Sequence, residues 1–203
     1  MDSSFLKDKH KDQTIWIVGK GPSLRYIRKD HFGEGIILTL NESIVAIESL
    51  ELPNIIYSLQ KDGGNGRHGA LKNALTPECD YSGQCEDVCG SMVRPKKATL
   101  ILHELESKYC FSDYPNRVVF DLETLGLQAN IHSIVFAVKI AIYLGCNKVN
   151  FLCCDSTAIG DSRTYVPGKG ISIETLYGNQ RPYMLPILEG IEGDWITPLE
   201  IDK

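Results

Sequence analysis

A glycine-rich turn after the first apolar run of the sequence could bind phosphate. The run Thr14–Val18 is followed by Gly19, Lys20, Gly21, Pro22 and Ser23. Glycine lets the backbone approach a phosphate closely, and a helix that begins beside such a turn points free N–H groups at the anion. Pro22 suits the first helical turn because it lacks an N–H, and Ser23 could bind phosphate or cap the helix. A tight turn with a structural role alone is the alternative.

Three charged residues near apolar runs could serve phosphate chemistry. Lys20 could pair with a di- or triphosphate. Asp62 and Asp155 each lie at the end of a predicted strand. Carboxylates in such places can hold Mg²⁺ in phosphate-handling sites, or act as the general base that takes the proton of an acceptor hydroxyl. The alternative is that Asp62 caps a turn and Asp155 caps a helix.

A group of cysteines could bind zinc. Cys79, Cys85 and Cys89 are separated by five and three residues, and His68 or Cys110 could complete a tetrahedral site. The spacing matches no common zinc motif and contains no C-x-x-C. Free thiols in a polar insertion are therefore the favoured interpretation.

The composition is that of a globular protein. Of 203 residues, 43% are hydrophobic and 23% are charged, which indicates a single domain without disordered or repeated segments. No stretch approaches the roughly 20 apolar residues of a membrane span. Residues 1–13 lack the apolar core of a secretory signal, so we predict a short solvated lead-in and a cytoplasmic protein. Seven cysteines, of which Cys153 and Cys154 lie in a predicted buried strand, favour reduced thiols over disulfides.

The net charge of -5 argues against a nucleic-acid partner. Arg94–Lys97, which reads RPKK, is a small cationic cluster. We interpret it as a solvated surface or as a contact for an acidic acceptor.

Apolar runs alternate with amphipathic ones. Strands are predicted at residues 14–19, 35–41, 53–62, 100–103, 116–123 and 148–156, and helices at 24–32, 42–50 and 130–145, the last stopped by Gly145. This alternation predicts an α/β fold with a Rossmann-like parallel sheet and helices on both faces. Residues 63–97 are predicted to be an insertion or long loop, and residues 156–203 an irregular, lid-like segment.

Three segments carry a family resemblance. VGKGPSL, at Val18–Leu24, resembles the G-[NK]-G-P-S-L opening of bacterial sialyltransferases that use CMP-sialic acid, and of MptE-like proteins, which include archaeal 6-hydroxymethylpterin pyrophosphokinases. ILTLNES is similar to the second strand of these families. HSIVFAVKIAIYLGCNKVNFLCCDS is similar to their segment in which a serine opens a helix that leads into a strand ending in aspartate.

The resemblance implies roles for particular residues. Nucleotide contacts would come from Gly19, Lys20, Gly21, Ser23, Asn41 and Ser133. Asp155 would be the strand-end aspartate, and Tyr165 would help the phosphate leave, with simple packing as the alternative for Tyr165. The chain departs from the sialyltransferases because no histidine follows Asp155, where they carry their proposed catalytic histidine. It also has Lys20 where they usually have asparagine and Ile134 where they have glycine, and these departures argue against sialyl transfer itself.

Together these features predict a nucleotide-dependent transferase. The favoured activity is glycosyl transfer from a CMP-, UDP- or GDP-sugar to a hydroxyl-bearing acceptor. One alternative is an MptE-like pyrophosphokinase that uses ATP and Mg²⁺, and another is a non-catalytic protein that binds a nucleotide or serves a larger assembly.

Overall fold

Seven parallel strands form one sheet in the computed structural model, which describes residues 3–19, 22–41, 43–61, 94–104, 111–127, 133–154 and 191–196. The strands are β1 (Thr14–Val18), β2 (Ile36–Leu40), β3 (Ile55–Leu59), β4 (Thr99–His103), β5 (Arg117–Phe120), β6 (Lys148–Leu152) and β7 (Glu192–Ile196). Their order across the sheet is β5-β4-β3-β2-β1-β6-β7, and each neighbouring pair is parallel. The predicted Rossmann-like α/β fold is confirmed.

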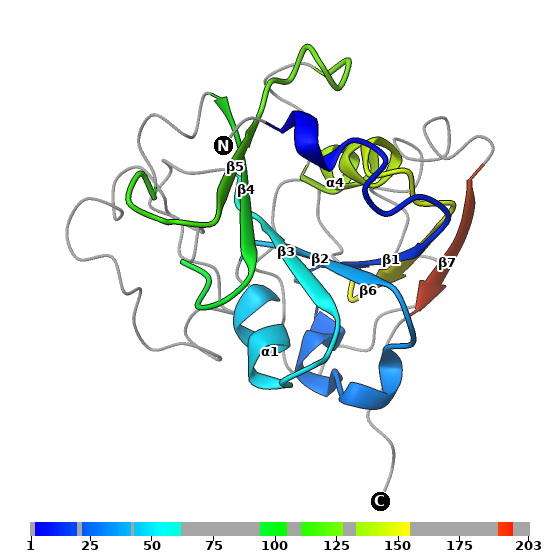
Figure 1. Cartoon of the computed structure of the whole chain (residues 1–203). Coiled ribbons are helices and arrows are strands. Elements are labelled where there is room, and N and C mark those ends of the chain that lie inside the picture. Colours follow the sequence, from blue (N-terminus) through cyan, green and yellow to red (C-terminus); the bar gives the residue numbers. More distant parts are fainter. Residues whose placement is uncertain are drawn as a thin grey trace, which may run out of the picture.

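Helices cover both faces of the sheet (Figure 1). The helix α4 (Ser133–Tyr143) lies on one face, and α1 (Ser43–Ser49) lies on the other with the 3-10 helix η2 (Pro22–Tyr26). Two further 3-10 helices are η1 (Ser4–Leu6) and η3 (Lys29–His31). Among the described residues, no helix has the length and apolar composition needed to cross a membrane.

The strands are apolar on both sides because both faces of the sheet are covered. Ile15 and Ile17 of β1 belong to the core under α4, whereas Trp16 and Val18 belong to the core under α1. All five residues of β2 are buried. Continuous apolar runs of this kind are typical of parallel strands, which is why the sequence predicted them well.

The helix α4 is buried on most of its circumference. Seven of its eleven residues are buried, and it begins at Ser133, as the resemblance implied. Its end also agrees with the prediction, because Gly145 adopts a positive φ of 82° just beyond the last turn. Such left-handed conformations are readily adopted by glycine and terminate helices.

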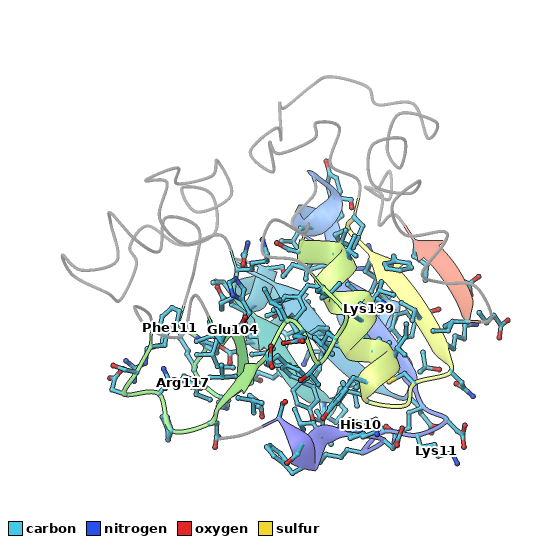
Figure 2. The ribbon with its side chains drawn as sticks, turned by 90° about the horizontal axis from the view of Figure 1, so that it is seen from above. His10, Lys11, Glu104, Phe111, Arg117 and Lys139 are labelled. Carbon is cyan, nitrogen blue, oxygen red and sulfur yellow. The ribbon has the colours of Figure 1, made fainter. Side chains whose placement is uncertain are left out.

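The described part of the predicted solvated lead-in, residues 3–13, is mostly exposed, but it is attached to the folded domain. The N–H groups of Asp8, His10 and Asp12 donate to the carbonyl oxygens of Tyr143, Leu144 and Gly145 at distances of 2.9, 2.8 and 2.9 Å. These bonds satisfy carbonyl groups that the end of a helix leaves without partners. Figure 2 shows the labelled His10 and Lys11 beside this end of α4. The segment is therefore fixed against the end of α4, and its Leu6 contributes to the core.

Two other parts of the chain differ from the prediction. The helix predicted at residues 24–32 is two short 3-10 helices, η2 and η3. Strand β7, within the segment predicted to be irregular, pairs with β6 from Lys148 opposite Glu192 to Leu152 opposite Ile196. Residues 94–97 of the predicted insertion lead into β4, and its remainder, residues 63–93, lies outside the described residues.

Candidate functional site

The direction of chain progression reverses between β1 and β6. From β1 the chain builds β2 to β5 on one side, whereas β6 and β7 lie on the other. Because all seven strands are parallel, their last residues meet at one end of the sheet, which we call the carboxyl end; the opposite end is the amino end. Ligands of open α/β sheets bind outside the carboxyl end where the direction reverses, so the residues that follow β1, β2, β3 and β6 form the candidate site.

Gly19 lies where the chain leaves β1, in contact with the end of β6. Its N–H donates to the carbonyl oxygen of Leu152 at 2.8 Å. A Cβ atom at this position would lie 2.5 Å from the carbonyl oxygen of Cys153 and 3.0 Å from the Sγ atom of Cys154. The structure therefore explains the glycine by close packing of two strand ends, a reason that the sequence interpretation did not include.

Asn41 follows β2 directly and is held by hydrogen bonds of both its backbone and its side chain. Its N–H donates to the carbonyl oxygen of Leu59 at 2.9 Å, and its own carbonyl oxygen accepts from the Nε2 atom of Gln60 at 2.9 Å. Its side-chain Oδ1 accepts from the N–H of Lys61 at 2.8 Å. The backbone is left-handed, with a φ of 50°, a conformation that asparagine tolerates better than most residues.

These bonds leave one group of Asn41 unused. The side chain is almost fully buried, with 2% of the residue exposed, yet its Nδ2 atom makes no hydrogen bond to any residue that the structure describes. Because Oδ1 is fixed on Lys61, the direction of the Nδ2 donor is fixed as well. The sequence placed Asn41 at a nucleotide-contacting position, and its local geometry is that of a rigid hydrogen-bond donor.

Residues at the end of β3 were missed by the sequence interpretation. Gln60 is fully buried, and its Nε2 atom also contacts the Oγ atom of Ser58 at 2.7 Å. Lys61 is buried, with only 5% exposed, and its backbone N–H is the donor that holds the Asn41 side chain. The signal was available, because both residues lie at the end of the predicted strand 53–62, which must meet the end of the neighbouring strand.

Ser43, at the start of α1, is a second residue that was missed. Its Oγ atom lies 2.9 Å from the carbonyl oxygens of Val18 and Leu40, and it accepts from the N–H of Leu40 at 2.9 Å. A hydroxyl donates only one hydrogen, so it serves one of the two carbonyls at a time. The fully buried Ser43 thereby joins the ends of β1 and β2 and supports the turn that carries Asn41.

Ser23 and Ser133 are the other proposed contacts that the structure describes. Ser23 is buried in η2, directly after the glycine-rich turn. Ser133 is the first residue of α4, and Phe136 in the same turn lies 6.0 Å from His103, the last residue of β4, between ring centroids. The start of α4 therefore lies near the carboxyl end at β4, whereas Gly19 and Asn41 follow the adjacent strands β1 and β2.

Most of the predicted metal, catalytic and phosphate-binding residues lie outside the described residues. They are Lys20, Gly21, Asp62, His68, Cys79, Cys85, Cys89, Cys110, Asp155 and Tyr165. Among the residues that the structure does describe, no group of three or more histidine, cysteine, aspartate or glutamate side chains could hold a metal ion. Cys146, Cys153 and Cys154 are buried thiols that form no disulfide, as predicted for Cys153 and Cys154.

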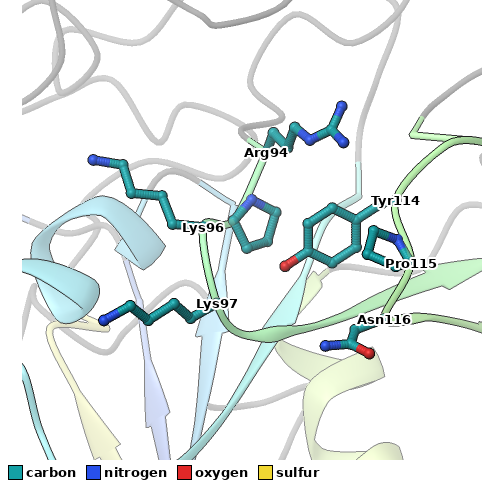
Figure 3. A pocket seen from close by; sticks show the side chains of 7 residues that line it. Arg94, Lys96, Lys97, Tyr114, Pro115 and Asn116 are labelled. Carbon is teal, nitrogen blue, oxygen red and sulfur yellow. The ribbon is translucent and has the colours of Figure 1, made fainter.

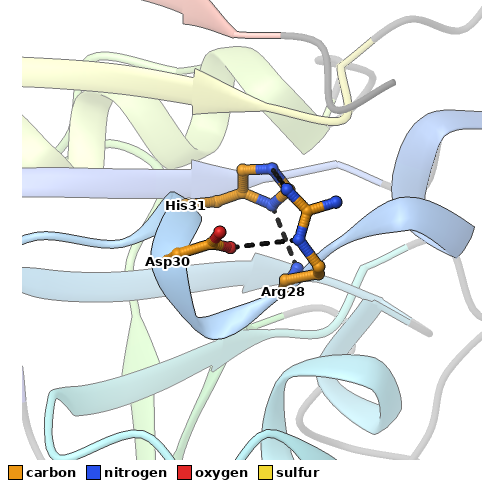
Figure 4. A network of polar contacts seen from close by, with 3 residues as sticks. All are labelled: Arg28, Asp30 and His31. Atoms are coloured by element: carbon orange, nitrogen blue, oxygen red, sulfur yellow. Dashed lines mark hydrogen bonds and ion pairs between the residues drawn. The ribbon is translucent and has the colours of Figure 1, made fainter. Parts of the chain in front are cut away.

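A second polar cluster, Arg28, Asp30 and His31, has a structural role (Figure 4). The Nδ1 atom of His31 accepts from the N–H of Arg28 at 3.0 Å and so caps η3. In neutral His31 the hydrogen is then on Nε2, and the 3.4 Å approach of Arg28 Nη2 to Nε2 brings two donors together. Burial, and then the charge of Arg28, lower the pKa of His31. The neutral form of His31 can accept the hydrogen bond of this cap. The cluster is therefore structural and is not part of the candidate site at the carboxyl end of the sheet.

Comparisons with known proteins bear on the fold alone. No protein-family model matches the chain, and no curated protein matches it. Thiamine pyrophosphokinase from Bacillus subtilis has 12% identity and a TM-score of 0.43, over 91% of this chain and 60% of that one. The sialyltransferase CstII from Campylobacter jejuni, in complex with cytidine-5'-monophosphate, has 12% identity and a TM-score of 0.45, over 93% of this chain and 81% of that one. The chain thus spans 60% of the pyrophosphokinase, and both likenesses concern the arrangement of sheet and helices.

Proposed function

We propose that this protein is a nucleotide-dependent transferase that binds a nucleotide-linked donor across the carboxyl end of the sheet. The observation that carries the proposal is the side chain of Asn41, which the N–H of Lys61 fixes and whose Nδ2 donor no described residue uses, one strand from the point where the chain direction reverses. A ligand that accepts a hydrogen bond from Nδ2 would use this fixed donor.

The ends of β2 and β3 form one unit at this place. The backbone N–H of Lys61, at the end of β3, donates to the side chain of Asn41, at the end of the adjacent strand β2. A phosphate group accepts hydrogen bonds and would suit the Nδ2 donor that this unit holds in place. The resemblance adds Lys20, Gly21, Ser23 and Ser133 as further phosphate or ribose contacts.

For glycosyl transfer the remaining roles would fall to residues after the strand ends. The acceptor hydroxyl oxygen would form a bond to the anomeric carbon of the sugar while the bond from that carbon to the phosphate oxygen breaks. Asp155 or Asp62 would take the hydroxyl proton as general base or hold Mg²⁺, and Tyr165 would donate to the departing phosphate. The sugar donor would be a CMP-, UDP- or GDP-sugar.

Pyrophosphoryl transfer from ATP is the second candidate. Lys20 favours it, because a cation beside the glycine-rich turn can pair with the several charges of a triphosphate. Dependence on the metal separates the two activities. EDTA should abolish an ATP-driven reaction, whereas turnover of a CMP-sugar in EDTA would exclude the pyrophosphokinase.

A thermal-shift screen of CMP, UDP, GDP and ATP, each with and without Mg²⁺, tests the proposal. A ligand that binds only the folded state at 100 times its Kd stabilises it by about 2.7 kcal/mol, or roughly 5 to 10 °C for a chain of this size. The informative variant is Asn41→Asp, which keeps an oxygen for the N–H of Lys61 and replaces the Nδ2 donor by a second oxygen. Asn147→Asp is the control, because it adds the same charge at an exposed position just before β6.

We expect one nucleotide to raise the Tm of the wild type and of Asn147→Asp but not that of Asn41→Asp. Far-ultraviolet circular dichroism checks that Asn41→Asp is folded. Equal Tm shifts in all three proteins would show that Asn41 does not contact the nucleotide. If no nucleotide shifts the wild type at millimolar concentration, the protein is not a nucleotide-dependent transferase.

A further inference from the structure

A basic pocket lies at the amino end of the sheet (Figure 3). Its volume is about 470 Å³, and its lining residues are Arg94, Pro95, Lys96, Lys97, Tyr114, Pro115 and Asn116. Residues 94–97 precede β4, and residues 114–116 precede β5. Because a five-residue strand is roughly 17 Å long, this amino-end pocket is well separated from the candidate site at the carboxyl end.

One wall of the pocket is held in place by Glu48 of α1. Its carboxylate accepts hydrogen bonds from the N–H groups of Lys96, Lys97 and Ala98 at 2.8 to 3.0 Å. Three successive N–H groups that converge on one anion form a tight, defined backbone turn. The Glu48 carboxylate therefore binds backbone N–H groups and not the lysine side chains. Figure 3 shows the Lys96 and Lys97 side chains extending from this turn.

The opposite wall is also fixed. The Tyr114 hydroxyl donates to the carbonyl oxygen of Ala98 at 2.7 Å, and burial raises the pKa of Tyr114, so the hydroxyl keeps its proton. The Arg94 guanidinium lies over the Tyr114 ring, 5.5 Å from its centroid, and bonds to the carboxylate of Asp113 at 2.8 Å. Both walls are therefore formed without a ligand, which lowers the entropic cost of binding one.

Lys96 and Lys97 provide the excess positive charge of the pocket. Both are exposed, and neither ammonium group forms an ion pair with a residue in the described ranges. The two nearby carboxylates are engaged elsewhere, Glu48 by backbone N–H groups and Asp113 by Arg94. Two lysines adjacent in the sequence, closely preceded by an arginine, are a local excess of positive charge in a protein whose net charge is -5.

We propose that the amino-end pocket binds a small anion of the phosphate class that carries several negative charges. An ammonium group is a compact point charge that suits phosphoryl oxygens, whereas the planar guanidinium that would favour a carboxylate already has one in Asp113. A single negative charge gains little from exposed lysines in water, because solvent and salt screen the attraction. Several charges on one small ligand gain from both lysines at once. The exposed amide of Asn116 adds hydrogen-bonding groups on the other wall.

This proposal does not depend on the proposed transferase activity. Pyrophosphate is the simplest probe, and titration of the ¹⁵N-labelled full chain with sodium pyrophosphate at constant ionic strength, without Mg²⁺, distinguishes the two ends of the sheet. We expect saturable changes in the amide signals of residues 96–98, 114 and 116. The Lys96→Gln/Lys97→Gln variant should weaken this binding roughly tenfold. The control is Lys7→Gln/Lys29→Gln, which removes two exposed charges elsewhere and should bind like the wild type.

Three results would overturn the proposal. The first is the absence of saturable changes at residues 96–98. The second is equal affinity in the two double variants, which would mean non-specific attraction. The third is binding of a glutamate decapeptide in place of pyrophosphate, which would make the pocket a docking surface for an acidic protein. Changes confined to Asn41 and Lys61 would also exclude this pocket while leaving the carboxyl-end site in place.

Discussion

The Nε2 atom of His10 lies 2.7 Å from the hydroxyl oxygen of Tyr57, and the two rings meet edge to face with centroids 5.6 Å apart. Only 3% of His10 and 1% of Tyr57 are exposed. Burial raises the pKa of Tyr57 to about 12, so its hydroxyl stays protonated and can donate to the ring of a neutral His10. The pair joins the N-terminal segment to β3, beneath the end of α4.

Stability should fall as the pH drops below about 6.5. Burial, with the charge of Lys9, lowers the pKa of His10, and burial also lowers that of His31. In the unfolded chain both histidines take up a proton near their ordinary pKa, whereas the folded protein binds these protons only at lower pH. Acidification therefore favours the unfolded chain. Urea unfolding at intervals from pH 8 to pH 5 measures the effect.

The His10→Gln variant identifies the histidine responsible. Glutamine can still bond to the Tyr57 hydroxyl but does not titrate, so the free energy of unfolding should depend less on pH between 7 and 5 than in the wild type. His31→Gln should remove the part of the pH dependence that is due to His31. If the free energy of unfolding depends on pH equally in the wild type and in His10→Gln, the His10–Tyr57 pair does not cause the loss of stability in acid.

Gly19→Ala should destabilise the fold by about 1 to 3 kcal/mol. The added methyl group would lie 2.5 Å from the carbonyl oxygen of Cys153, so the ends of β1 and β6 would have to move apart. Gly33→Ala is the matched control, because its methyl group would meet only Trp16, at 3.6 Å, an ordinary contact distance. Denaturant unfolding of both variants gives the difference. If the two substitutions cost the same, the contact at Gly19 is not as close as described.

Glu48→Gln should destabilise the protein by about 1 to 2 kcal/mol, because it replaces charge-assisted hydrogen bonds to the N–H groups of Lys96, Lys97 and Ala98 by weaker ones. Hydrogen exchange of these amides should become faster. Glu51→Gln, at an exposed position just after α1, is the control and should change neither quantity. Unchanged exchange in Glu48→Gln would mean that the turn does not need the carboxylate.

The sequence predicted the elements that are mostly buried. β2 is buried throughout, β1, β4 and β6 are buried after their first residue, and β3 is buried over its last three residues, and such mostly apolar runs leave a clear pattern. β7 was missed because Glu192, Gly193 and Asp194 are exposed at the edge of the sheet, where no core selects apolar residues. The N-terminal segment was misjudged because its attachment to α4 uses backbone N–H groups, which every residue except proline possesses.

The candidate site could be predicted only in part. The motif resemblance indicated Asn41, but the bond from Asn41 to Lys61 depends on the pairing of β2 with β3, which a local motif does not reveal. The role of Gly19 was attributed to a phosphate because its neighbours at Cys153 and Cys154 come from a distant part of the sequence. Ser43 was overlooked for the same reason, since its contact with Val18 crosses between strands.

The contact between the ends of β1 and β6 has a consequence for assembly during synthesis. The Sγ atom of Cys154 approaches the carbonyl oxygen of Ile17 at 3.8 Å, although 137 positions separate the two residues along the chain. While a ribosome is still making the second half of the protein, β1 therefore lacks one of its two neighbours. A nascent chain that ends before β6 should leave this edge of β1 without a neighbour, and the edge should be covered only in a single late step.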